Sequence, residues 1–263
     1  MIANLRFGVI VLLTIMVLLV LLPLHLVALV FARFGWTKLA GILPLLFHRI
    51  ILRLFGVRLT IEGKLAKNRP LLLVSNHISW LDIVVLAALE PLSFVAKAEM
   101  ASWPVFGQLA KLQRTVFVKR EERRKAGQQA NEIAERITAR EIMVLFPEGT
   151  TSDGYGLLPF KTPLFEAAKM ALISSPVQEA IVQPIAIDYT HLHGLPLGRA
   201  LQRHVAWPGE VGLGESLIPL VREGALDVTV HVGEPIILTE QSNRKIVAAQ
   251  AATRIREMLR SSS

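Results

Sequence analysis

The chain of 263 residues is rich in hydrophobic side chains (52%), poor in charged ones (19%) and without cysteine. This composition argues against a disordered protein, and it excludes disulfides, thiolate catalysis and cysteine-based zinc sites. The net charge of +8 calls for an anionic partner. Because lysine and arginine are spread along the chain without interleaved aromatic residues, an anionic lipid surface or an acidic carrier protein fits better than nucleic acid.

The amino-terminal segment has the composition of a membrane anchor. Residues 7–32 carry no charge, and only Pro23 and His25 interrupt a run of leucine, valine and isoleucine between Arg6 and Arg33. A spanning helix needs about 20 apolar residues. A signal peptide has a shorter apolar region of about 7–15 residues and a small-residue cleavage site. We therefore predict a permanent anchor, which either spans the bilayer or turns back at Pro23.

A second apolar stretch follows at residues 36–57 and is bent at Pro44. Arg49 and Arg53 are four residues apart and therefore share one helical face. This pattern predicts an interfacial helix with its cations at the lipid headgroups, and a core helix of the folded domain is the alternative. We divide the chain into a membrane anchor with interfacial helix (residues 1–57) and one folded domain (residues 58–263).

Beyond residue 57, short β-rich runs alternate with helical patterns, which predicts an α/β domain whose mixed sheet is covered by helices. The candidate strands are residues 58–62, 70–74, 92–96, 115–118, 142–145, 181–187 and 227–232. Helical periodicity is clearest at residues 121–140, and a closing helix is expected at 243–260. Residues 191–219 contain many glycines and prolines, which predicts a long loop region.

A histidine and an aspartate follow the candidate strand at 70–74, within the sequence SNHISWLD. On a regular helix, five positions turn about 500°, which would leave His77 and Asp82 on different faces. The two side chains can meet only if His77 precedes a helix and Asp82 lies in its second turn. In that arrangement Asp82 holds one imidazole nitrogen and leaves the other free as a general base.

Two further strands end in polar groups. The strand at 142–145 runs into Phe-Pro-Glu-Gly-Thr (residues 146–150), which predicts a turn with exposed backbone N–H groups; alone, an ordinary strand-end turn is the alternative. The strand at 115–118 is followed by Lys119 and Arg120. A guanidinium at that place can bind a phosphate or a carboxylate through two parallel hydrogen bonds.

In this order, the three segments resemble the glycerolipid acyltransferases, whose type member is 1-acylglycerol-3-phosphate O-acyltransferase. The resemblance covers residues 71–187. The matching positions are His77 and Asp82 of a His-x4-Asp motif, Arg120 of a strand that ends in arginine, the Phe-Pro-Glu-Gly run at 146–149, and Pro184 inside an apolar strand. Two positions depart from the pattern, because Arg114 and Pro163 stand where glycine is usual.

The resemblance implies a lysolipid O-acyltransferase. His77 would act as base on the acceptor hydroxyl and Asp82 would orient it. The residues implied to bind the polar head of the acceptor are Arg120, Glu148, Gly149 and Thr150. The hydroxyl would attack the thioester of acyl carrier protein or coenzyme A directly, without an acyl-enzyme, a cofactor or a metal. The missing Gly-x-Ser-x-Gly and His-Glu-x-x-His motifs agree with this expectation.

Within the family, the segments 112–118, 146–154, 193–198 and 205–207 are similar to those of the bacterial lyso-ornithine lipid O-acyltransferases. The acceptor of that branch is a hydroxy-fatty-acyl amide of ornithine, with a carboxylate in place of a phosphate. The resemblance implies an enzyme of the bacterial inner membrane with its domain on the cytoplasmic side. A lysophosphatidate acyltransferase is the enzymatic alternative, and a lipid-binding protein without turnover is the non-enzymatic alternative.

Overall fold

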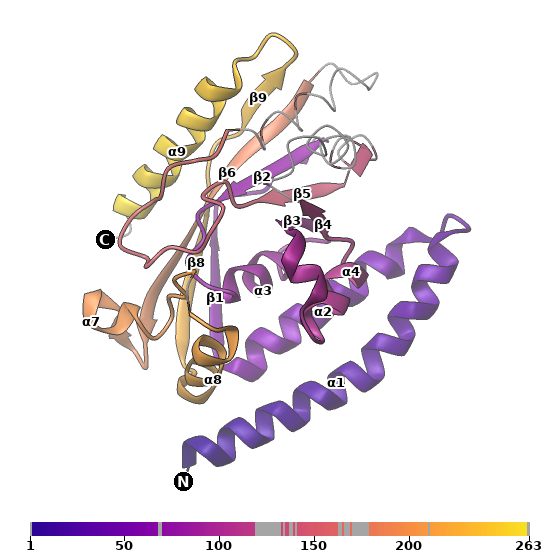
Figure 1. The fold of residues 1–263 in the computed structure, drawn as a ribbon, viewed down its shortest axis with the longest axis vertical. Helices are drawn as coiled ribbons and strands as arrows, with labels where there is room; N and C mark the ends of the chain where they lie inside the picture. The colour runs from indigo at the N-terminus through magenta and orange to yellow at the C-terminus, as the bar shows by residue number, and fades with distance from the viewer. Residues whose placement is uncertain are drawn as a thin grey trace.

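The computed structural model describes residues 2–67, 70–118, 133, 135–136, 139, 141–162, 165, 169, 179–209 and 211–261. Two helices open the chain, α1 (Ile2–Ala32) and α2 (Thr37–Phe55), and they pack against each other as a hairpin along one side of the α/β body (Figure 1). Helix α1 is continuous through Pro23. The chain therefore reverses at residues 33–36 and not at Pro23.

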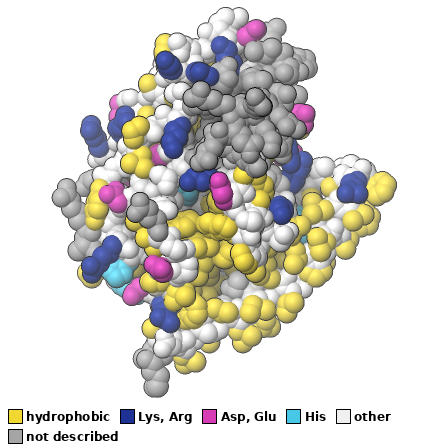
Figure 2. All heavy atoms as spheres, in the orientation of Figure 1, with side chains coloured by type: hydrophobic (Ala, Val, Ile, Leu, Met, Phe, Trp, Pro, Cys, Tyr) yellow, Lys and Arg dark blue, Asp and Glu magenta, His cyan; other side chains and the backbone are white. Residues whose placement is uncertain are grey.

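Helix α1 has the length and composition of a membrane helix. Within residues 3–32, the most apolar stretch of 18 residues has a mean hydropathy of 3.0, and only 6% of that stretch is buried. Its exposed side chains include Leu12, Leu19 and Val20, and the tip of the hairpin exposes Phe34 and Trp36. Figure 2 shows hydrophobic side chains gathered along the edge of the molecule that α1 forms. This exposure is unfavourable in water and indicates contact with lipid.

The sheet is mixed, as predicted, and its strands follow the order β1-β8-β6-β2-β5-β3-β4, with β7 and β9 also paired to β6. Strands β2 to β6 run in one direction, and β6 is antiparallel to β7, β8 and β9. The strands are β1 (Val57–Glu62), β2 (Leu71–Ser75), β3 (Ser93–Lys97), β4 (Val116–Val118), β5 (Ile142–Leu145), β6 (Glu179–Leu192), β7 (Leu195–Pro196), β8 (Leu226–Val232) and β9 (Ile236–Thr239).

Helices cover both faces of the sheet. Along β2, Leu71 and Leu73 join one buried cluster while Leu72 and Val74 join the other, because successive side chains of a strand point to opposite faces. The first cluster includes α2, α3 (Leu81–Ala87) and α8 (Leu213–Glu223), and the second includes α9 (Arg244–Ser261). The other helical segments are η1 (Ala98–Ser102), α4 (Phe106–Leu112) and α7 (Gly198–Gln202).

Most predicted strands are confirmed to within one or two residues, but the end of one strand and the long loop at residues 191–219 were predicted wrongly. Strand β6 extends to Leu192, and β9 was not predicted. The predicted loop at 191–219 contains β7, α7 and the start of α8. Helix α8 forms despite Pro219, because a stripe that includes Leu213, Leu217 and Leu220 packs on the core while Pro219 faces solvent. Most of the helix predicted at 121–140 lies outside the described residues.

Helix α2 buries one face against the body and carries Arg49 at the edge of that contact. Its guanidinium donates to the carbonyls of Ala88 (2.9 Å) and Leu89 (3.3 Å), at the carboxyl end of α3. These carbonyls carry the negative end of the helix dipole and attract a cation. Arg49 is nevertheless exposed, as is Arg53, so an interfacial position of this helix stays a prediction. The domain boundary at residue 57 stays a prediction.

Arg6 fastens the amino end of α1 to the body. Its guanidinium donates to the carbonyls of Val221 (2.8 Å) and Arg222 (2.6 Å) in the last turn of α8, and to that of Phe55 (3.0 Å) at the end of α2. Gly224 leaves the space that this guanidinium occupies, because a Cβ atom there would collide with it. The hairpin is thus held to the body by hydrogen bonds as well as by packing.

Candidate active site

The polar segments found in the sequence meet at one edge of the sheet. Strands β2, β3 and β5 are parallel, so their carboxyl ends lie at the same edge. His77 follows β2, Lys97 ends β3, and the Phe-Pro-Glu-Gly turn (residues 146–149) follows β5. The structure therefore brings together two segments that are about 70 residues apart in the sequence.

His77 and Asp82 are hydrogen-bonded, with 2.8 Å between Nδ1 of the imidazole and Oδ2 of the carboxylate. Oδ2 also accepts the backbone N–H groups of Ile78 (2.7 Å) and Ser79 (2.9 Å). Asp82 lies in the first turn of α3, so the prediction of the second turn is wrong. The segment before the helix is not helical and folds back over the carboxylate, which lets the pair meet one turn earlier.

The hydrogen bonds define which nitrogen of His77 carries the proton. Backbone N–H groups can only donate, so Asp82 acts as acceptor toward all of its partners. Nδ1 of His77 is then the protonated nitrogen, and Nε2 keeps a free lone pair. The Asp82 side chain is fully buried, while His77 is 13% exposed. The exposed nitrogen is therefore suited to remove a proton from a bound hydroxyl.

The Phe-Pro-Glu-Gly turn fixes the backbone of His77. The His77 N–H donates to Oε1 of Glu148 (2.7 Å), and the Ser152 N–H donates to the His77 carbonyl (2.8 Å). The imidazole stacks on the Phe146 ring, with 3.9 Å between centroids and 14° between planes. His77 is thus held at its ring, its N–H and its carbonyl.

Glu148 is buried beneath this turn, with 2% of its surface exposed. Its second oxygen, Oε2, accepts the N–H of Leu158 (2.8 Å). Burial raises the pKa of Glu148 to about 7, and the two amide hydrogen bonds oppose that rise. Both oxygens therefore contact the protein, and the prediction that Glu148 binds the acceptor stays a prediction. Gly149 has the left-handed φ of 79° that the turn requires.

Two groups near His77 were given no role from the sequence. The side-chain amide of Asn76 donates to the Ile187 carbonyl (2.9 Å) and accepts the Ile187 N–H (2.8 Å), which replaces a strand pairing at the end of β2. Tyr189, also on β6, donates its hydroxyl to Oδ1 of Asp82 (2.6 Å). Both partners are more than 100 residues away along the chain, so no local spacing could reveal them.

A pocket of about 500 Å³ opens beside His77. Gly149 and Thr150 line it, although their binding of the acceptor stays a prediction, and the rings of Trp103 and Trp207 meet edge to face with 6.1 Å between centroids. The lining of the pocket also includes Phe94, Lys97, Met100, Phe106 and Phe146. Among the described lining residues, Lys97 carries the positive charge, and it is exposed. Arg120 lies outside the described residues.

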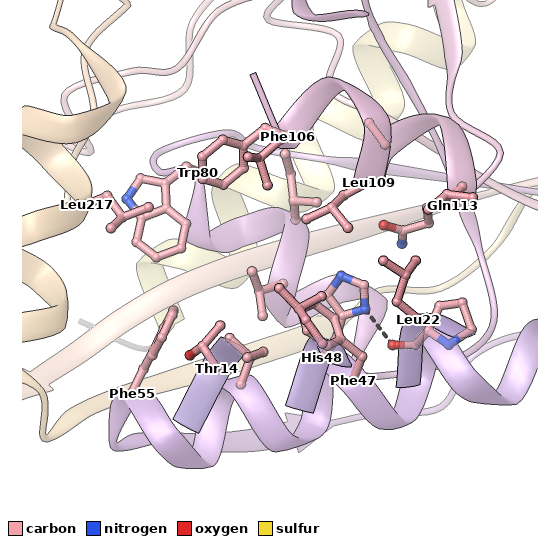
Figure 3. Close-up of a pocket in the computed structure, with 18 of the residues that line it drawn as sticks. Thr14, Leu22, Phe47, His48, Phe55, Trp80, Phe106, Leu109, Gln113 and Leu217 are labelled. Carbon is pink, nitrogen blue, oxygen red and sulfur yellow. Dashed lines mark hydrogen bonds between the residues drawn. The ribbon is translucent and has the colours of Figure 1, made fainter. Parts of the chain in front are cut away.

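A second, almost wholly apolar cavity of about 390 Å³ lies between the hairpin and the body. Figure 3 shows Thr14 and Leu22 of α1 on one side of it and Trp80, Phe106 and Leu109 on the other. The two cavities are adjacent, because they share the lining residues Ile83, Met100, Trp103, Phe106, Trp207 and Leu213. The pocket beside His77 thus adjoins the apolar cavity under the hairpin.

Arg114 does not belong to the site. Its guanidinium pairs with Glu141 at 2.7 Å, and its backbone has a φ of 62°. Only glycine adopts this conformation without strain, which explains why glycine is usual at this position of the motif. Pro163, the other departure, lies outside the described residues.

The fold and the His77–Asp82 pair define an acyltransferase. A family model described as Acyltransferase matches residues 56–188. A crystal structure of the 1-acyl-sn-glycerophosphate acyltransferase from Thermotoga maritima has the same fold, with a TM-score of 0.58 and 23% identity over 86% of this chain and 82% of that one. The chain belongs to the acyltransferase family and is an enzyme of the lysolipid acyltransferase type.

Individual relatives place the chain more narrowly. Lyso-ornithine lipid O-acyltransferases from Brucella abortus and Rhizobium meliloti are 52% and 47% identical to it. The alignments cover 86% of this chain and 84% of the Brucella protein, and 94% of this chain and 83% of the Rhizobium protein. A 1-acyl-sn-glycerol-3-phosphate acyltransferase from Neisseria gonorrhoeae is 42% identical, over 40% of this chain and 42% of that protein.

Proposed function

We propose that this protein transfers a fatty acyl group from an acyl thioester to the hydroxyl of lyso-ornithine lipid, forming ornithine lipid. The observation that carries the proposal is an intact His77–Asp82 pair beside an apolar pocket, in a chain that matches two lyso-ornithine lipid O-acyltransferases over most of its length. The acyl group enters as a thioester and leaves as an oxygen ester without a change in oxidation state, so we propose a reaction without a cofactor or a metal.

The proposed reaction is a direct transfer. Nε2 of His77 removes the proton of the acceptor hydroxyl while its oxygen attacks the thioester carbonyl carbon. The carbon–sulfur bond then breaks, and the leaving thiolate takes the proton back from the imidazolium. Between these events the buried carboxylate of Asp82 stabilises the positive charge on the ring. The acyl group thus passes directly from sulfur to oxygen, without an acyl-enzyme, and His77 returns to its neutral form.

The acceptor head group lies, in this proposal, at the Lys97 end of the pocket. A carboxylate there meets the ammonium of Lys97. Arg120, which the family resemblance predicts to bind the head group, would supply a second cation. Arg114 is paired with Glu141 and is not available for a more highly charged phosphate. The hydroxyl of Thr150, which lines the same pocket, offers a hydrogen bond to the ornithine amide or amine.

The apolar cavity takes an aliphatic chain. Its walls come from the hairpin that contacts lipid and from the catalytic body, so a chain can enter sideways from the bilayer. The basic charge of the protein suits an acidic acyl carrier protein as donor, and coenzyme A is the alternative.

We place the enzyme on the inner membrane of a bacterium, with the catalytic body on the cytoplasmic side, where thioester donors are made. Exposed apolar side chains along α1 and at Phe34 and Trp36 support membrane contact. Arg6 keeps the amino end of α1 against the body. The hairpin would then lie in the membrane beside the catalytic body and not extend away from it.

Lysophosphatidate is the second candidate acceptor, favoured by the Neisseria gonorrhoeae relative. A competition assay separates the two: purified enzyme in detergent receives equal lyso-ornithine lipid and lysophosphatidate with acyl-loaded carrier protein. We expect lyso-ornithine lipid to be acylated faster, and His77→Ala to abolish both products. A preference of about tenfold or more for lysophosphatidate in kcat/KM contradicts the proposed acceptor and leaves the acyltransferase chemistry in place.

A further inference from the structure

Tyr189 contacts Asp82 of the catalytic pair and is not among the residues that line the pocket. It belongs to β6, where Ile185, Ile187 and Tyr189 alternate into the same buried cluster. Its side chain is 3% exposed, and its hydroxyl reaches Oδ1 of Asp82 at 2.6 Å. This is the shortest of the four hydrogen bonds that Asp82 accepts.

The four bonds divide unequally between the two oxygens of Asp82. Oδ2 accepts from His77, Ile78 and Ser79, while Oδ1 accepts from Tyr189. In the part of the chain that the structure describes, Tyr189 is thus the donor to Oδ1, and its loss would leave a buried carboxylate oxygen without that donor. Such a group costs free energy and tends to turn or take a proton.

Tyr189 keeps its proton at any working pH. Burial and the neighbouring charge of Asp82 raise its pKa well above the usual range. The hydroxyl therefore remains a donor while His77 passes through its charged state. A strong donor on Oδ1 withdraws charge from the carboxylate and so weakens its hold on a proton at His77.

We propose that Tyr189 is a positioning residue of the catalytic pair: its buried hydroxyl holds Asp82 in the ionised, correctly turned state and limits how strongly Asp82 retains the proton on His77. This inference rests on the proposed function. The limit matters because the imidazolium must release its proton to the thiolate in the second half of the reaction. Without Tyr189, Asp82 would favour proton transfer from the hydroxyl to His77 but hinder proton transfer from the imidazolium to the thiolate.

The titratable groups facing Asp82 in the described part of the chain come from three elements. His77 lies before α3, Glu148 follows β5, and Tyr189 is on β6. Helix α2 also packs on α3, but its Arg49 contacts Ala88 and Leu89 at the far end. A change in pH dependence after altering Tyr189 therefore reports on His77, Glu148 or Asp82 itself.

The chain offers a clean test, because Tyr155 and Tyr189 are its only tyrosines. Tyr155 is 55% exposed and does not line the pocket, so Tyr155→Phe serves as parent and control. Growing this parent on 3-fluorotyrosine labels position 189 alone. The fluorine makes the hydroxyl a stronger donor with little change in shape, whereas Tyr189→Phe removes the donor.

The rate of acyl transfer is measured against pH for the parent, the fluorinated parent and the Tyr155→Phe, Tyr189→Phe double variant. We expect the acidic limb of kcat/KM, which reports protonation of the base, to move to higher pH by about half a unit or more without the hydroxyl. We expect it to move to lower pH with fluorotyrosine. If the hydroxyl only stabilises the fold, its removal lowers the melting temperature and leaves the acidic limb unmoved. An unmoved limb in the fluorinated enzyme overturns the proposal, even if the double variant fails to fold.

A second measurement is independent of turnover. The fluorine resonance of position 189 should move when Asp82→Asn is introduced, because the hydroxyl then faces a neutral group. A resonance that does not move overturns the contact itself. A parent that folds and shows this response but transfers no acyl group contradicts the proposed function and leaves the role of Tyr189 toward Asp82 in place.

Discussion

The loop that carries His77 and the hairpin that faces it are held in different ways. Around His77 the structure is fixed by directed hydrogen bonds, from Glu148, Ser152 and Asp82. The hairpin packs mainly through apolar side chains, with Arg6 and Arg49 among its polar attachments to the body. Proton transfer needs fixed distances, whereas admission of a flexible chain needs an apolar surface that can adapt. The enzyme combines a rigid catalytic edge with a more adaptable lipid-facing wall.

The largest effect is expected at the rigid edge. His77→Ala should lower the turnover rate by roughly 10²–10⁴-fold, because it removes the general base. His193→Ala is the matched control, since His193 lies in the turn after β6, is half exposed and pairs with Glu223. Rates are measured with purified protein in detergent. If a well-folded His77→Ala enzyme works within a few-fold of wild type, His77 is not the base.

Loss of the Arg6 attachment should have the next largest effect. Arg6→Ala removes hydrogen bonds from a charged donor to carbonyls of two helix ends, where such bonds contribute about 1.5–3 kcal/mol when well shielded. Arg6 is partly exposed, so we expect the lower part of this range, seen as a reduced melting temperature and a several-fold loss of activity. Arg33→Ala, at the exposed opposite end of α1, should be neutral. Equal behaviour of the two variants contradicts the attachment.

The adaptable wall should control chain length more than rate. Leu109→Trp adds bulk to the apolar cavity and should shift preference toward shorter chains by a few-fold. Leu19→Trp, on the exposed face of α1, adds the same bulk outside and should not shift it. Competition between donors and acceptors of different length shows which chain the cavity holds. If Leu109→Trp leaves the chain-length preference unchanged for donors and for acceptors, the cavity holds neither chain.

The smallest effect is a pH dependence of stability at Glu148. Its pKa is 4.5 unperturbed and about 7 in the folded protein, so the folded state binds more protons between these values. The stability contributed by the neutral acid is complete below pH 4.5 and is lost as pH rises through 7. The melting temperature of the wild type should therefore fall relative to Glu148→Gln between pH 5 and 7.5. Exposed Glu90→Gln should track the wild type, and parallel curves for all three proteins refute this assignment.

Sequence reasoning succeeded where the determining contacts are local. His77 and Asp82 are five residues apart, and β2 and β5 are continuous apolar runs because the sheet is buried on both faces. It failed where distant contacts decide. The sequence could not show that Arg49 binds the carbonyl of Ala88, because that partner lies about 40 residues on, and the glycine and proline content of α8 hid this helix. Tyr189 is 107 residues from Asp82.

The central claim is that this enzyme makes ornithine lipid by acylating lyso-ornithine lipid, and lipid analysis of cells tests it most directly. Mass spectrometry compares extracts from cells with the gene, without it, and with the gene restored as wild type or His77→Ala. We predict that cells without the gene lose ornithine lipid and accumulate lyso-ornithine lipid, and that wild type but not His77→Ala restores the product. Unchanged ornithine lipid, with lysophosphatidate accumulating instead, would contradict the account.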